Sequence, residues 1–105
     1  MSAAPAPALP ALNRLVLQAK VQERGAVRYT PAGLPALDLG LKHESALTEA
    51  GQLRKVSVEI RAVAIGEIAQ RAAQLEIGSE TGFAGFLTAQ RNGRGVVFHV
   101  TEMAA

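Results

Sequence analysis

The amino-acid sequence predicts an all-β fold, a five-stranded barrel with one short helix between the third and fourth strands. Five segments alternate apolar and more polar side chains with the period of two expected of a half-buried strand. Between the third and fourth segments β-branched residues become rare and the apolar spacing turns helical. At 105 residues, the chain is long enough for one such domain to bury a core.

The first strand is expected over residues 15–22, where Leu15, Leu17, Ala19 and Val21 are the inward positions. Residues 1–12 carry three prolines among alanines, and proline removes a backbone donor and fixes φ. The sequence therefore predicts a disordered Ala/Pro-rich leader over 1–12 and one folded domain over 13–105.

The second and third strands are expected over 36–42 and 55–62, joined by a polar loop at 44–51 that ends in glycine. Leu37, Leu39 and Leu41 are the inward positions of the second strand. Val56, Val58 and Ile60 are those of the third, which has the cleanest alternation in the chain. If these side chains face the interior, alternation turns their neighbours toward solvent.

A short helix is expected between Gly66 and Gly78, a segment rich in Ala, Gln, Glu and Arg. Two strands follow, around 83–87 and 96–101, and the Asn92-Gly93 pair is typical of a tight hairpin. Of the three phenylalanines in these strands, at least two are expected in the core.

Five strands of this length leave exposed edges unless the sheet closes on itself. The OB-fold closes such a sheet into a Greek-key barrel with the helix at one end, whereas a β-sandwich has about seven strands and no helix. The order of three strands, one helix and two strands therefore favours an OB-fold barrel.

The composition narrows the functional classes. The chain has no cysteine, which excludes disulfides and thiolate metal sites and agrees with a cytoplasmic protein. No apolar run approaches the length of a membrane span, so no membrane association is expected. The formal net charge is only +2, so a polyanion would have to meet cations gathered on one face.

The side chains that would form such a face are basic and lie on outward strand positions or in the turns. The candidate nucleic-acid-binding residues are Lys20, Arg28, Lys42, Arg54, Lys55, Arg61, Arg91 and Arg94. Asp38, Glu44 and Glu59 lie on or near the same surface and would repel phosphates. Tyr29 is a candidate for stacking on a base, with packing as the alternative.

Catalysis and metal binding find no support in the sequence. His43 and His99 lie far apart with no third ligand at a recognisable spacing, so both are interpreted as structural or surface residues and no metal is expected. The chain has no nucleophile elbow and no phosphate-binding glycine loop. We therefore expect a binding protein without cofactors and without enzymatic activity.

Several short segments, taken in order, resemble a known family. They are Asn13-Arg14-Leu15-Val16-Leu17, Pro31-Ala32-Gly33-Leu34-Pro35, Leu41-Lys42-His43-Glu44, Glu49-Ala50-Gly51, Ile77-Gly78-Ser79 and Gly85-Phe86-Leu87. Over about residues 13–102 the chain resembles primosomal replication protein N, the PriB family. The resemblance implies a homodimeric OB-fold related to single-stranded DNA-binding protein that acts in bacterial replication restart. Its implied partners are single-stranded DNA, a PriA-type restart helicase and other primosome proteins.

The sequence also departs from the better-known family members. Ser57 stands where they carry a tryptophan, and Gln52 replaces a phenylalanine. Their long lysine-rich loop between the last two strands is reduced here to residues 91–95. We therefore expect weak DNA binding. Two alternatives stay open: a protein-interaction module of the primosome with little or no DNA binding, and a general single-strand DNA- or RNA-binding protein.

Overall fold

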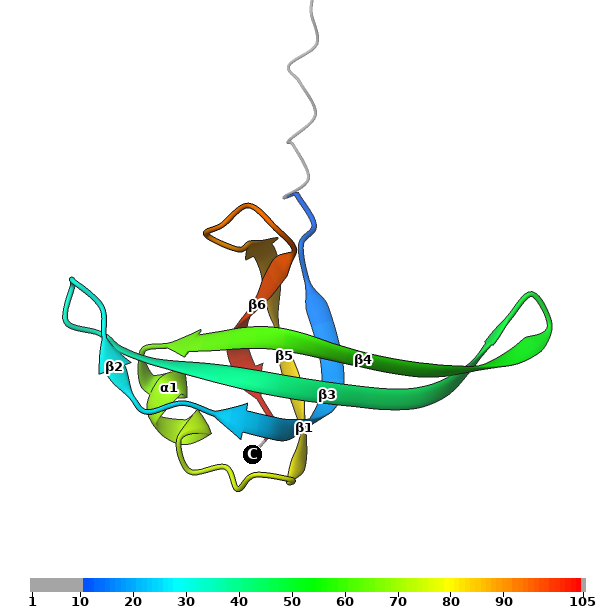
Figure 1. Cartoon of the computed structure of the whole chain (residues 1–105), viewed down its shortest axis with the longest axis horizontal. Helices are drawn as coiled ribbons and strands as arrows, with labels where there is room; N and C mark the ends of the chain where they lie inside the picture. The colour runs from blue at the N-terminus through cyan, green and yellow to red at the C-terminus, as the bar shows by residue number, and fades with distance from the viewer. Residues whose placement is uncertain (1–10, 105) are drawn as a thin grey trace, which may run out of the picture.

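The strands follow the predicted order, with one short addition. The computed structural model describes residues 11–104, so residues 1–10 of the expected leader lie outside it. It contains β1 (Leu15–Arg24), β2 (Arg28–Tyr29), β3 (Pro35–Glu49), β4 (Gln52–Ile65), α1 (Glu67–Ala72), β5 (Glu80–Ala89) and β6 (Val96–Met103) (Figure 1). The five expected strands correspond to β1, β3, β4, β5 and β6. The addition is β2, which pairs with the start of β3.

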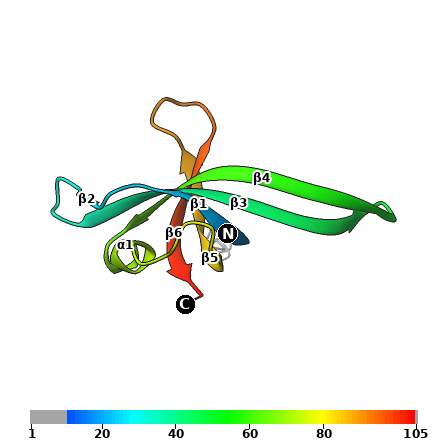
Figure 2. The ribbon, with the colours of Figure 1, turned by 60° about the horizontal axis from the view of Figure 1, so that its bottom comes forward.

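The sheet closes into a barrel because β1 pairs on both sides. Residues 15–20 of β1 pair with β5, and residues 20–24 pair with β3, both in antiparallel orientation. The antiparallel pairs β3–β4 and β5–β6 are joined by a short parallel pairing of Ala62–Ala64 with Phe98–Val100. The ring is therefore β1, β3, β4, β6 and β5. Figure 2 gives a second view of these strands. The predicted five-stranded OB-fold barrel is confirmed.

The predicted helix is also present, and it is only six residues long. It starts after Gly66, whose φ of 93° suits glycine, and it buries Ala69 and Ala72 against the barrel. It contacts β3, β4 and β6. Residues 73–78, which were also expected to be helical, instead lead back to β1, where the Gly78 amide donates to the Val21 carbonyl at 2.7 Å. No helix within residues 11–104 is long and apolar enough to cross a membrane.

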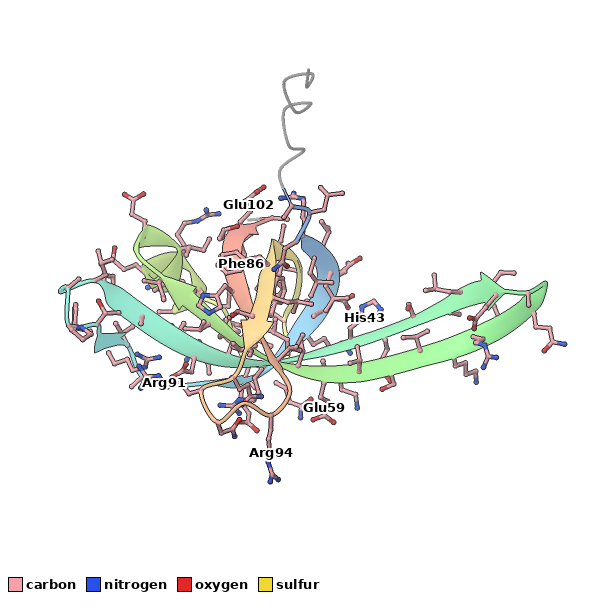
Figure 3. The ribbon with its side chains drawn as sticks, turned by 90° about the horizontal axis from the view of Figure 1, so that it is seen from above. His43, Glu59, Phe86, Arg91, Arg94 and Glu102 are labelled. Carbon is pink, nitrogen blue, oxygen red and sulfur yellow. The ribbon has the colours of Figure 1, made fainter. Side chains whose placement is uncertain are left out.

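Beyond the barrel β3 and β4 continue as a two-stranded ribbon, residues 43–58, which extends away from the other strands (Figure 3). The expected polar loop at 44–51 is therefore wrong, because pairing continues to Glu49 opposite Gln52. Ala50 and Gly51 form the turn with φ of 52° and 77°. Positive φ at both central positions gives the two-residue turn whose twist matches antiparallel strands.

The inward positions assigned to the third strand need the same correction. Val56 is half-buried and Val58 is exposed, because both lie on the ribbon, where none of the strands within residues 11–104 covers their face. Ile60 packs against the core, and Ala62 and Ala64 further along β4 are buried in it. The alternation identified a strand correctly but did not show where the barrel ends.

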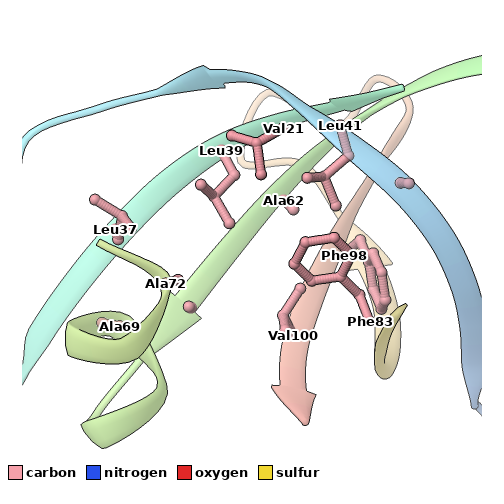
Figure 4. Close-up of a cluster of buried hydrophobic side chains, with 12 residues drawn as sticks. Val21, Leu37, Leu39, Leu41, Ala62, Ala69, Ala72, Phe83, Phe98 and Val100 are labelled. Atoms are coloured by element: carbon pink, nitrogen blue, oxygen red, sulfur yellow. The ribbon is translucent and has the colours of Figure 1, made fainter. Parts of the chain in front are cut away.

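The core lies inside the barrel and under α1 (Figure 4). Its buried members are Ala19, Val21, Leu37, Leu39, Leu41, Ala62, Ala64, Ala69, Ala72, Phe83, Phe98 and Val100. The inward positions predicted for the second strand are all buried. Two phenylalanines are in the core, as expected. Phe86 is on the outside and 39% exposed.

Candidate nucleic-acid interface

An open groove of about 550 Å³ lies between β2 and the β5–β6 hairpin. Residues 28–31 form one side and residues 88–91 the other, while residues 61–63 of β4 and His99 of β6 also line it. Arg28, Arg61 and Arg91 all reach this groove, although they come from three separate segments. Tyr29, 69% exposed, lies beside them.

The strand registers explain how these side chains arrive there. Arg61 is paired with Gly40 on the outer face, because its neighbours Ile60 and Ala62 face inward. Arg28 is held by the pairing of β2 with Ala36. Arg91 lies in the hairpin, whose connection runs over residues 90–95 and is longer than the tight turn expected from Asn92-Gly93. The Gly93 amide donates to the Gln90 carbonyl at 2.8 Å and shapes this turn.

The other predicted basic residues separate into distinct places. Lys20 lies directly opposite Lys42 on the outer face, and the register places Lys55 on the same face of the ribbon. Arg54 lies on the opposite face of the ribbon, where it is paired with Glu49. Arg94 does not line the groove, and in Figure 3 its side chain extends away from the hairpin tip.

Two of the three groove arginines already have carboxylate partners. Arg28 forms a fork with Asp38: its Nε lies 3.1 Å from Oδ2 and its Nη2 lies 3.2 Å from Oδ1. The hydrogen bonds from Arg28 to Asp38, and then the negative charge, raise the pKa of Arg28 above its ordinary value. Arg61 Nη1 lies 3.7 Å from Glu23 Oε2. The part of the chain described here places no carboxylate within ion-pair distance of Arg91.

The carboxylates form a belt between the groove and the lysines. A hollow of about 150 Å³ shares Asp38 and Arg61 with the groove and is bounded by Glu23. A further hollow of about 100 Å³ is lined by Glu23 and by Glu59, which accepts from Gln22 Nε2 at 3.2 Å. Beyond Glu59 lies Lys42, directly across the strand pair. We call Asp38, Glu23 and Glu59 the acidic belt.

Sequence reasoning did not identify Glu23 or the pair formed by Phe86 and His99. A bulge between Val21 and Glu23 shifts the register and brings Glu23 opposite Gly40 on the outer face. The rings of Phe86 and His99 stack with centroids 4.9 Å apart and planes 13° apart. Phe86 lies directly opposite His99 in the β5–β6 pair. The contact therefore follows from the register of this hairpin, which the sequence pattern alone does not give.

His43 has a structural environment. Its Nδ1 lies 2.6 Å from the Gln18 carbonyl and its Nε2 lies 2.8 Å from the Ser45 hydroxyl. It therefore joins the base of the ribbon to β1. Across residues 11–104, no three His, Asp or Glu side chains are grouped so that they could hold a metal ion.

Comparison with known proteins assigns the family. Residues 13–102 match a family described as "Another single-strand binding protein family". Replication restart protein PriB of Bordetella pertussis is 50% identical over 80 residues, which cover 76% of this chain and 75% of that protein. The structure of PriB from Ralstonia solanacearum is 34% identical with a TM-score of 0.82, and the match covers 90% of this chain and 97% of that one.

A single-stranded DNA-binding protein structure gives a second, more distant match. The protein from Thermus aquaticus is 32% identical with a TM-score of 0.69, and the match covers 89% of this chain and 49% of that one. The overall fold is thus shared with both kinds of protein. The chain belongs to the PriB family of replication restart proteins, which is related to single-stranded DNA-binding protein.

Proposed function

We propose that this protein is a non-enzymatic accessory factor of replication restart that binds single-stranded DNA in the groove between β2 and the β5–β6 hairpin. The observation that carries the proposal is the convergence of Arg28, Arg61 and Arg91 on one open groove. The family supports a role in replication restart, and its relation to single-stranded DNA-binding protein supports the ligand.

The groove is suited to phosphates more than to bases. Arginine donors reach phosphate oxygens, whereas nonspecific single-strand binding also depends on bases stacked on aromatic rings. Tyr29 is exposed at the groove and is the ring best placed to stack on a base. Binding that depends mostly on phosphate contacts is weak and falls steeply as salt is added.

Lys20 and Lys42 lie beyond the acidic belt and would extend the path of the bound DNA strand past the groove. They lie directly opposite each other on adjacent strands, and Glu80 and Glu59, opposite them on their other sides, offset the like charges. A phosphate bound between the lysines would meet two ammonium groups. Lys55, on the same face of the ribbon, would continue the path outward.

We further propose that the protein acts as a homodimer that bridges DNA to a PriA-type restart helicase and other primosome proteins in the cytoplasm. Among residues 11–104, residues 15–19 of β1 pair with β5 on one side only, because pairing with β3 begins at Lys20. This leaves an open strand edge, which is a template for pairing with another chain. Val16 and Phe86, both exposed, lie on the outer face of the adjoining strands. A mass of one subunit by light scattering at micromolar concentration would contradict the dimer.

One observation favours a second candidate, a protein-interaction module of the primosome with little DNA binding. The carboxylates that pair with Arg28 and Arg61 reduce the positive charge available in the groove. The two candidates differ in whether the wild-type protein binds an unstructured oligonucleotide at low salt.

Fluorescence anisotropy with a labelled oligothymidine at two salt concentrations tests the proposal. We expect binding at low salt that weakens at high salt, and a further loss in the Arg91→Gln variant. Arg14→Gln is the matched control, because Arg14 is paired with Glu102 and does not line the groove. No binding by the wild-type protein at low salt would support the protein-interaction module.

A further inference from the structure

The acidic belt and a bound phosphate would compete for the same donors, the guanidinium groups of Arg28 and Arg61. Asp38 accepts from both Nε and Nη2 of Arg28, the edge of the guanidinium that a phosphate would engage in a bidentate contact. Glu23 lies within ion-pair distance of Arg61. Carboxylates therefore already lie against two of the three arginines that a strand would meet in this groove.

These ion pairs contribute little to folding. The side chains of Arg28 and Asp38 are 54% and 46% exposed, and those of Arg61 and Glu23 are 61% and 70% exposed. Exposed pairs of this kind add little stability, because water screens the attraction and two long side chains lose freedom. Their placement in the groove is therefore not explained by stabilisation of the barrel.

The position of the belt also interrupts the proposed path. Asp38 lines the groove itself, Glu23 lines the hollow beside it, and Glu59 lines the next one before Lys42 is reached. Carboxylates along a phosphate path repel the ligand in addition to occupying the donors. Both effects lower affinity without closing the groove.

We propose that Asp38 and Glu23 limit the affinity of this groove for single-stranded nucleic acid by holding Arg28 and Arg61 in ion pairs that keep them from the phosphate backbone. The inference rests on the proposed function, because it treats the groove as the binding site. The two carboxylates then set how readily the protein releases a strand, while Arg91, with no carboxylate within ion-pair distance among the described residues, is the groove arginine free to contact phosphate.

The test is the affinity and salt dependence of Asp38→Asn, Glu23→Gln and the double variant for a labelled oligothymidine. Each substitution keeps the side-chain shape and releases one arginine. We expect each single variant to bind about three- to tenfold more tightly at low salt than the wild-type protein. The slope of log K against log salt should steepen by about 0.7 for each released arginine that gains a phosphate.

Two controls separate this effect from a general change in charge. Glu102→Gln changes the net charge by the same amount, but Glu102 is paired with Arg14, and Figure 3 shows it on the other side of the molecule from Arg91 and Arg94. It should leave the affinity unchanged. Arg28→Gln/Asp38→Asn should return the salt slope to that of the wild-type protein, because the released donor is absent.

The outcomes distinguish this inference from the proposed function. Wild-type binding with no gain in Asp38→Asn and Glu23→Gln, or an equal gain in Glu102→Gln, would overturn the inference and leave the proposed function standing. Binding only by the double variant would support the inference and show that the wild-type groove is not a DNA site. Absence of binding in all variants would overturn both.

Discussion

The strand pair β3–β4 runs through both the barrel and the ribbon, but its side chains are buried only in the barrel. Between Leu37 and Leu41 one face of β3 is buried, and each of the three leucines on it is at most 1% exposed. Beyond His43 the pairing with β4 continues in the same register, but both faces meet solvent or only partial cover. Backbone pairing therefore extends further than burial, and residues 44–49 of β3 pair with β4 without an alternating pattern in the sequence.

The largest expected difference between the barrel and the ribbon is in stability. Phe98→Ala removes a fully buried ring from the barrel and should lower the free energy of unfolding by about 3–5 kcal/mol. Leu53→Ala, on the ribbon at 71% exposure, should change it by less than about 0.5 kcal/mol. Urea unfolding followed by circular dichroism, at one protein concentration, measures both. Similar losses would mean that the ribbon contributes to the core.

A second contrast lies within β5. A Cβ on Gly85 would lie 1.8 Å from the His99 carbonyl oxygen, since the register shifts there by one residue. Gly85→Ala should therefore lower the free energy of unfolding by about 1–3 kcal/mol. Gly82→Ala is the matched control, because its Cβ would meet only the Ala104 methyl at 3.6 Å. A thermal or urea unfolding series that ranks the two variants equally would contradict the role given to the close approach.

The difference in burial between the barrel and the ribbon explains how much of the fold could be predicted from the sequence. The five strands of the barrel and the buried leucines follow from alternation, because each strand is covered on one side. The helix follows from the helical spacing of its apolar residues. The ribbon was interpreted as a loop, since residues 44–51 have no covered face and hence no alternation. For Val56 and Val58 the alternation was real, but the sequence does not show where a strand leaves the barrel.

The candidate site was predictable in part for the same reason. Outward positions for Lys42, Lys55 and Arg61 follow from alternation, and the register agrees with them. Arg54 falls on the other face because it is one residue from Lys55. Glu23 could not be predicted, because a bulge reverses the alternation of β1 just before it. The ion pairs depend on the pairing of separate strands, which no local pattern encodes.

The ribbon turn offers a smaller and more local effect. Gly51 has a φ of 77°, so Gly51→Ala should strain the turn by about 1 kcal/mol. Hydrogen–deuterium exchange should then speed up over residues 43–58 and stay unchanged over residues 37–41, because the ribbon opens without the barrel. Gly51→Asn is the control, since asparagine tolerates this conformation better. Faster exchange throughout the barrel would show that the barrel and the ribbon unfold together.

The smallest expected effect tests the two faces of the ribbon with neighbouring residues. Lys55 lies on the face that continues from Lys42, whereas Arg54 lies on the opposite face and is paired with Glu49. Lys55→Gln should weaken oligothymidine binding about twofold and reduce the salt slope by about 0.7, as expected for the loss of one phosphate contact. Arg54→Gln removes the same charge from the adjacent position and should change neither quantity. Equal losses in the two variants would mean that the strand responds only to total charge, and the assignment of one binding face to the ribbon would then fail.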